Sequence, residues 1–98
     1  MTIKKTQEGT TLTVVLEGEL NTQTAPQLEA ELPADMEGVD LLILDLTAVE
    51  YLSSAGLRVI LVAQQSLADR GGVTVRGASE DLREIFEVTG LDEILTFE

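Results

Sequence analysis

Residues 41–62 read LLILDLTAVEYLSSAGLRVILV, and this stretch decides the fold. Its first part, Leu41–Leu46, is almost wholly apolar, which is typical of a central parallel strand that is buried on both faces. A short connection and two serines follow, and a helix is then expected. Ser53 and Ser54 therefore stand at a helix start, where backbone N–H groups are unpaired and the helix dipole favours negative charge.

A helix is predicted for Gly56–Asp69, because its apolar residues recur at helical spacing. The apolar arc is wider than one stripe, which indicates a helix that is covered on more than one side or that lends an apolar edge to a partner. Gly71 and Gly72 are expected to end this helix, and Val73–Arg76 to form the next strand. Strand, helix and strand then make a βαβ unit with a right-handed crossover. The residues of the arc are Leu57, Val59, Ile60, Leu61, Val62, Ala63, Gln64 and Leu67.

The residues before this unit predict a hairpin and a short helix. Ile3–Gln7 and Thr11–Glu17 are rich in Thr and Val and flank a turn that contains Gly9. Thr24-Ala25-Pro26 opens the helix, since proline is tolerated in a first helical turn. Pro33 is expected to help end it.

The residues after the unit predict one more helix. Ser79 is expected to be its N-cap, and Gly90 to close it. Leu91–Phe97 then supplies a last strand or a short terminal segment. Residues 1–98 are thus predicted to form a single α/β domain, a sandwich of a mixed sheet of about four or five strands with helices packed mainly on one side. The residues that share one face of the last helix are Leu82, Ile85, Phe86 and Thr89.

The composition excludes several classes of function. The chain has no Cys and no His, which removes disulfides, thiol catalysis, the usual general base and the commonest metal ligand. No metal site, cofactor or catalytic residue is predicted. Eighteen acidic and six basic residues give a net charge of −12, which repels nucleic acid and anionic membranes and either attracts basic partners or serves solubility alone. Without a signal peptide or a membrane-spanning run, the expected location is the cytoplasm.

Three roles are open to the serine pair: a plain N-cap, a phosphate acceptor or a nucleophile. Leu52–Gly56 resembles half of a nucleophile elbow around Ser54, but the leading glycine and any histidine base are missing. A Ser–Lys pair would need Lys4 or Lys5 from the far terminus. A nucleotide site is also disfavoured, since the chain has no glycine-rich phosphate-binding motif and Arg58 is the only cation near the serines.

Three segments stand out in this order along the chain: Gly18–Leu28 (GELNTQTAPQL), Leu44–Val59 (LDLTAVEYLSSAGLRV) and Phe86–Leu91 (FEVTGL). Together they resemble the anti-sigma factor antagonist family, the bacterial STAS domains. The resemblance runs over nearly the whole chain, and three separate segments in the right order make it specific.

Membership of this family implies a binding switch rather than an enzyme. The unphosphorylated form of such proteins binds an anti-sigma factor that is also a serine kinase of the histidine-kinase-like ATPase type, and this binding frees a sigma factor. The kinase then phosphorylates the antagonist on a serine at the helix start, and the complex dissociates. A phosphatase of the PP2C type resets the switch.

The resemblance assigns roles residue by residue. The family motif Asp-Ser-Ser-Gly-Leu corresponds to residues 53–57, so Ser54 matches the phosphate acceptor. Ser53 stands where Asp is common and is the alternative acceptor. Asn21 stands where the family often has Asp, and it could hydrogen-bond near the serine loop or cap the following helix. The implied partner-binding residues are Asn21, Thr22, Ser53, Ala55, Gly56, Leu57 and Arg58.

The chain ends at Glu98 without a kinase, transporter or sensor domain, which favours a free-standing antagonist, monomeric when free. The alternative is a STAS domain that is not phosphorylated and serves as a scaffold or regulatory subunit of a transporter or a stress-sensing complex.

Overall fold

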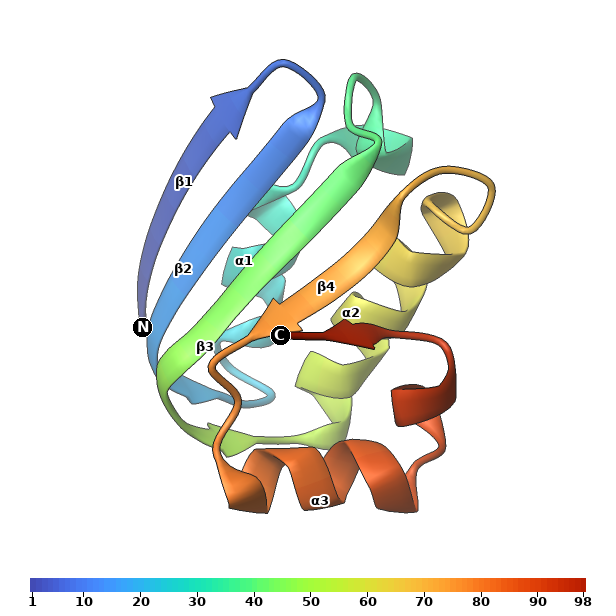
Figure 1. The fold of residues 1–98 in the computed structure, drawn as a ribbon. Coiled ribbons are helices and arrows are strands. Elements are labelled where there is room, and N and C mark those ends of the chain that lie inside the picture. Colours follow the sequence, from blue (N-terminus) through green and yellow to red (C-terminus); the bar gives the residue numbers. More distant parts are fainter.

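A computed structural model describes residues 1–98 as a five-stranded mixed sheet with three helices, as predicted (Figure 1). The strands lie in the order in which they occur in the chain. The first two strands are antiparallel, and each later strand runs parallel to the one before it. The strands are β1 (Thr2–Glu8), β2 (Thr11–Leu20), β3 (Leu41–Leu52), β4 (Gly72–Arg76) and β5 (Thr96–Phe97).

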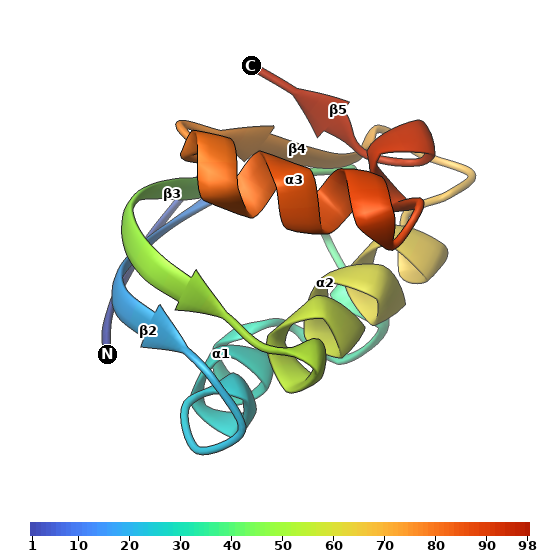
Figure 2. The ribbon, with the colours of Figure 1, turned by 90° about the horizontal axis from the view of Figure 1, so that it is seen from below.

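The helices lie together on one side of the sheet. The view from below shows the sheet as a curved layer with all three helices on its concave side (Figure 2). The opposite side, here called the open face, carries no helix. The helices are α1 (Ala25–Glu31), α2 (Ser54–Ser66) and α3 (Glu80–Val88), with short 3-10 turns at Ala34–Met36 and Leu91–Glu93. No helix is both long and apolar enough to cross a bilayer.

The N-terminal hairpin is confirmed, and its second strand is longer than predicted. Glu8 pairs with Thr11 across a turn in which Gly9 has a φ of 61°, a conformation that glycine adopts without strain. Strand β2 continues past Glu17 to Leu20, whose side chain is fully buried. This extra length carries β2 to the level at which β3 ends.

The central strand β3 is not buried on both faces, so that prediction was wrong. Leu42, Leu44 and Leu46 are buried beneath the helices, whereas Leu41 and Ile43 on the open face are only half-buried. The cause is that all helices lie on one side, so that the other side is shielded only by neighbouring side chains of the sheet. The predicted central position and parallel pairing of β3 are confirmed.

Helix α2 begins two residues earlier than predicted and ends at Ser66. The chain leaves the helix at Leu67, so Gly71 and Gly72 do not cap it, and Gly72 instead opens β4 with a φ of 77°. The buried stripe of α2 is narrower than the apolar arc, and Val62 is 54% exposed. The helix therefore does present an apolar edge to solvent. The stripe consists of Gly56, Val59, Ile60, Ala63 and Leu67.

The C-terminal predictions hold in outline. Ser79 caps α3, since its Oγ accepts the N–H of Leu82 at 3.2 Å, and Gly90 follows the helix with a φ of 77°. The last segment forms a 3-10 turn and the two-residue strand β5. Phe97 of β5 packs edge-on against Phe86 of α3, with ring centroids 5.3 Å apart.

Candidate functional site

The serine loop lies at the carboxyl ends of the parallel strands, the edge at which open α/β sheets commonly bind ligands. Leu20 at the end of β2 pairs with Leu52 at the end of β3. The backbone N–H of Ser53 then donates to the carbonyl of Leu20 at 2.9 Å. The loops that follow the two strands, one leading to α1 and the other to α2, therefore leave the sheet side by side.

The structure separates the two serines by what their hydroxyls do. Ser53 is the N-cap of α2, and its Oγ accepts the N–H of Gly56 at 3.3 Å. Ser54 is the first residue of the helix, is exposed, and makes no side-chain hydrogen bond. The capping role open to the pair is thus filled by Ser53, and the hydroxyl of Ser54 has no partner within the protein.

Asn21 stabilises the turn that precedes α1, but it does not cap the helix itself, whose N-cap is Thr24 without a side-chain cap hydrogen bond. Its Oδ1 accepts the N–H groups of Gln23 at 2.9 Å and Thr24 at 3.0 Å. In return the backbone N–H of Asn21 donates to Thr24 Oγ1 at 2.8 Å. This reciprocal arrangement resembles a capping box, and it fixes the course of the loop beside the serines.

Gly56 lies beneath the surface and not on it. A Cβ atom at this position would stand 2.6 Å from Cγ of Leu20 and 3.0 Å from Cδ1 of Leu52. Glycine is therefore needed for α2 to approach the ends of β2 and β3. Gly56 therefore has a packing role in the free protein, and Leu57 beside it is half-buried, while the contact of both residues with a partner stays a prediction.

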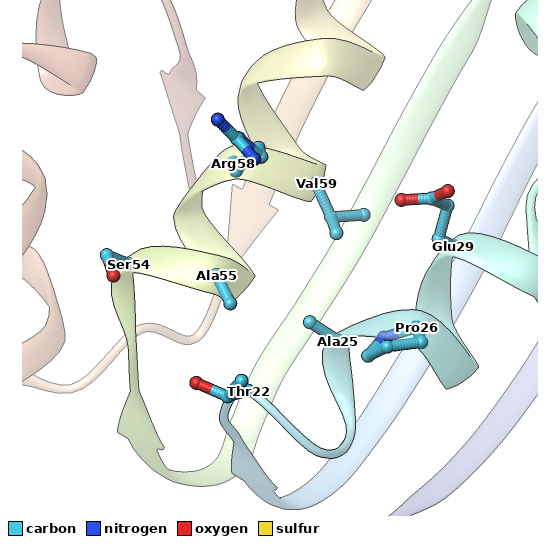
Figure 3. Close-up of a pocket in the computed structure, with 8 residues that line it drawn as sticks. All are labelled: Thr22, Ala25, Pro26, Glu29, Ser54, Ala55, Arg58 and Val59. Atoms are coloured by element: carbon cyan, nitrogen blue, oxygen red, sulfur yellow. The ribbon is translucent and has the colours of Figure 1, made fainter.

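A shallow groove of about 480 Å³ lies between the N-terminal ends of α1 and α2 (Figure 3). Four of the predicted site residues line it, whereas Asn21, Ser53, Gly56 and Leu57 lie beside or beneath it. Sequence reasoning missed its α1 wall, because only the pairing of β2 with β3 brings the two helix starts together. The lining residues are Thr22, Ala25, Pro26, Glu29, Ser54, Ala55, Arg58 and Val59.

The groove continues along the two helices into a second, more apolar hollow of about 570 Å³. Glu29 and Val59 line both parts, and the exposed edge residue Val62 lines the second. We call the two parts together the α1–α2 groove. The remaining lining residues of the second part are Ala30, Leu32, Pro33, Ala34, Asp35, Met36, Ala63 and Ser66.

The basic groups expected for a Ser–Lys pair lie outside the groove. Lys4 pairs with Glu17 at 3.7 Å, and Lys5 pairs with Glu31 at 3.1 Å, both from strand β1. Arg58 is the one basic residue in the lining. The site thus offers an unpaired hydroxyl, small neutral neighbours, one guanidinium and, on the opposite wall, the carboxylate of Glu29.

The two titratable groups with shifted pKa values lie on the open face of the sheet. The hydroxyl of Thr47 at 2.7 Å and its N–H at 3.0 Å hold the pKa of the Asp45 carboxyl below its usual range. Hydrogen bonding to Glu98 raises the pKa of Arg76. No three carboxylates cluster closely enough to hold a metal ion.

Comparisons with known proteins agree with this geometry. The family model described as "Mlab, STAS domain" matches residues 3–96. BtrV of Bordetella bronchiseptica is 42% identical over 81% of this chain and 70% of its own length. The anti-sigma-B factor antagonist of Listeria monocytogenes is 39% identical over 84% of this chain and 74% of its own length.

Similarity in structure extends over almost the whole chain. The crystal structure of an anti-sigma factor antagonist from Mycobacterium paratuberculosis superimposes with a TM-score of 0.85 and 29% identity, over 98% of this chain and 83% of that one. The sheet order, the serine loop and these relatives lead to one conclusion. The chain belongs to the bacterial STAS family of anti-sigma factor antagonists.

Proposed function

We propose that this protein is an anti-sigma factor antagonist whose unphosphorylated form binds an anti-sigma factor and so releases a sigma factor. The observation that carries this proposal is the exposed hydroxyl of Ser54 on the groove wall, with the capping role already filled by Ser53. The relative from Listeria monocytogenes, which bears the name anti-sigma-B factor antagonist, supports the same activity.

The proposed switch is phosphorylation of Ser54 by the anti-sigma factor, a serine kinase with a histidine-kinase-like ATPase fold. A phosphate adds about −1.5 to −2 charges near neutral pH. The helix dipole favours that charge within this protein, whereas a partner packed against small neutral residues would have to desolvate it. Phosphorylation should therefore break the complex, and a PP2C-type phosphatase would restore it.

The proposed contact surface consists of the exposed residues of the α1–α2 groove. Thr22, Ala55 and Arg58 surround Ser54, and Val62 extends the surface along the helix. Asn21 and Ser53 act by holding the two loops in place. The net charge of −12 would draw a basic partner face toward this surface.

In this proposal the protein works by binding and not by catalysis. Lys4 and Lys5 are engaged on β1, and the one carboxylate in this part of the groove, that of Glu29, comes from the opposite wall to Ser54. We further propose that residues 1–98 act as a single STAS domain, monomeric when free, in the cytoplasm.

The first test is to incubate the protein with its cognate anti-sigma factor and Mg-ATP and to record intact mass and phosphopeptides. One added phosphate on Ser54 is expected, absent in Ser54→Ala and retained in Ser53→Ala. In binding assays Ser54→Ala should stay bound in the presence of ATP, and Ser54→Asp should bind more weakly. A phosphate found on Ser53 in the wild-type protein would contradict the choice of Ser54.

One alternative has a specific observation in its favour. Ser53 stands where the resemblance leads one to expect Asp, and the matching family model carries the description Mlab. A constitutive regulatory subunit of a transporter or a stress-sensing complex would need no phosphorylation. Purification of this protein with its partners from the native cell separates the two: transporter subunits without any kinase would favour the alternative.

A further inference from the structure

Arg58 is the one cationic side chain of this protein that has no partner. The other five basic side chains are engaged, four in ion pairs with carboxylates and Arg83 over the ring of Phe97, 5.4 Å from its centroid. Arg58 is exposed and lines the groove one helical turn after Ser54. Glu29 on the opposite wall is the other charged residue in this part of the groove, and it forms no ion pair with Arg58.

We infer that Arg58 closes on the phosphate once Ser54 is phosphorylated, forming an ion pair within the first turns of α2. This inference rests on the phosphorylation of Ser54 proposed above. Residues four apart on a helix have Cβ atoms only about 5–6 Å apart, so a long arginine side chain can span the gap. The planar guanidinium can offer two parallel N–H groups to two phosphate oxygens.

The closure requires a change of side-chain rotamer. In Figure 3 the exposed Arg58 side chain extends away from Ser54. Nothing holds it there, since no hydrogen bond or ion pair of Arg58 is present. A rotation of an exposed side chain takes place on the picosecond to nanosecond timescale, and no backbone movement is needed.

The consequence is that phosphorylation changes the groove in two ways at once. It places a dianion at the start of α2, and it withdraws the one free cation of the groove from an incoming partner. An acidic group of the anti-sigma factor that pairs with Arg58 in the unphosphorylated complex would lose its counterion at the same moment. The regulation thus works through a residue of this chain as well as through the phosphate itself.

The test is a phosphorus NMR titration of the protein with phosphoserine inserted at position 54 during synthesis. The chain has no His, the side chain whose usual pKa lies closest to pH 6, where the second ionisation of phosphoserine occurs. The charged groups around the phosphate are Arg58 and Glu29 in the groove, with Glu19 and Glu50 near the strand ends.

Arg58 stabilises the doubly charged form of the phosphate and should therefore lower the pH at which the phosphoserine at position 54 loses its second proton. Replacing it in Arg58→Gln is expected to raise the midpoint by roughly 0.2–0.7 of a pH unit, the range that one solvent-exposed ion pair can supply. The midpoint of Arg58→Lys should lie between those of the wild-type protein and Arg58→Gln, because lysine keeps the positive charge but cannot offer two parallel N–H groups to the phosphate. The difference between wild type and Arg58→Gln should shrink as salt is added.

Lys4→Gln is the matched control, because it also removes one positive charge, from a pair with Glu17 on the open face. Its midpoint should equal that of the wild-type protein. Equal midpoints for wild type and Arg58→Gln, or an equal rise in Lys4→Gln, would overturn the inference. Since the phosphoserine is inserted without a kinase, this outcome is independent of whether an anti-sigma factor phosphorylates Ser54, and the mass measurement above decides that question separately.

Discussion

At the scale of single residues, the two neighbouring serines of the site have different roles. The hydroxyl of Ser53 accepts a hydrogen bond from the N–H of Gly56, whereas the hydroxyl of Ser54 is exposed and unpaired. The sequence places both residues at a helix start but does not say which one begins the helix. That choice depends on where β3 ends, because the N–H of Ser53 is still bound to the carbonyl of Leu20.

Because only Ser53 makes a side-chain hydrogen bond, truncating the two serines should lower stability by different amounts. Ser53→Ala removes an N-cap and should lower the free energy of unfolding by about 1 kcal/mol, within the usual 0.5–2 kcal/mol for such caps. Ser54→Ala removes an exposed group with no partner and should change stability by less than about 0.5 kcal/mol. Urea denaturation of the two variants provides the comparison, and equal losses would mean that Ser53 does not cap the helix.

At the scale of elements, the βαβ unit was predictable from the residues and the groove was not. The apolar run of β3, the helical spacing of α2 and the strand after it are local patterns. Whether helices cover one face of β3 or both is not a local property. The alternate leucines of β3 pack against the helices in either case, so the sequence of the strand does not show that Ile43 lies on a face without helices. The α1 wall of the groove, with Glu29, likewise depends on the register of β2 against β3.

The approach of α2 to the sheet can be tested at Gly56. Gly56→Ala places a methyl group against Leu20, and crowding of this kind costs about 1–3 kcal/mol. Combining it with Leu20→Ala should recover part of that loss, because the obstructing side chain is then gone. Thermal or urea unfolding of the two single variants and the double variant gives the coupling energy. Strictly additive losses would show that the two residues do not compete for space.

The apolar edge of α2 can be tested with two exposed valines. Val62 lines the α1–α2 groove and is 54% exposed, while Val88 on α3 is 81% exposed and lies outside it. Val62→Glu should weaken binding of the cognate anti-sigma factor at least about tenfold, which corresponds to about 1.4 kcal/mol. Val88→Glu should leave the affinity within about twofold. Calorimetry can measure both, and equal affinities would confine the interface to the serine end of the groove.

At the scale of the whole molecule, the two sides of the sheet have different tasks. The helix side holds the core and the groove, and the open face carries the ionic contacts of Asp45, Arg76 and Glu98. Composition alone predicted an acidic molecule without histidine or thiol chemistry. It could not show that five of the six basic side chains would be engaged, because pairs such as Lys5–Glu31 and Arg76–Glu98 depend on how the elements pack in the fold.

The open face also predicts a dependence of stability on pH. The pKa of Asp45 is lowered by Thr47, so its stabilising effect is present above the unfolded value of about 3.9 and is lost as pH falls through the folded pKa. Asp45→Asn should therefore be less stable than wild type at pH 7, by up to about 1 kcal/mol. The gap should narrow toward pH 3 in urea denaturation. If the difference in stability between the wild-type protein and Asp45→Asn did not change with pH, the loss would come from altered packing and not from the lost charge.

The hydrogen bond from the N–H of Ser53 to the carbonyl of Leu20 also affects how fast the serine loop can open. Because the serine loop is hydrogen-bonded to the last residue pair between β2 and β3, it cannot open without fraying the end of the sheet. The amide of Ser53 should accordingly exchange its proton with solvent slowly for a loop residue. If Ser54 is phosphorylated as proposed, the lifetime of a signal would be set by the enzymes that add and remove the phosphate.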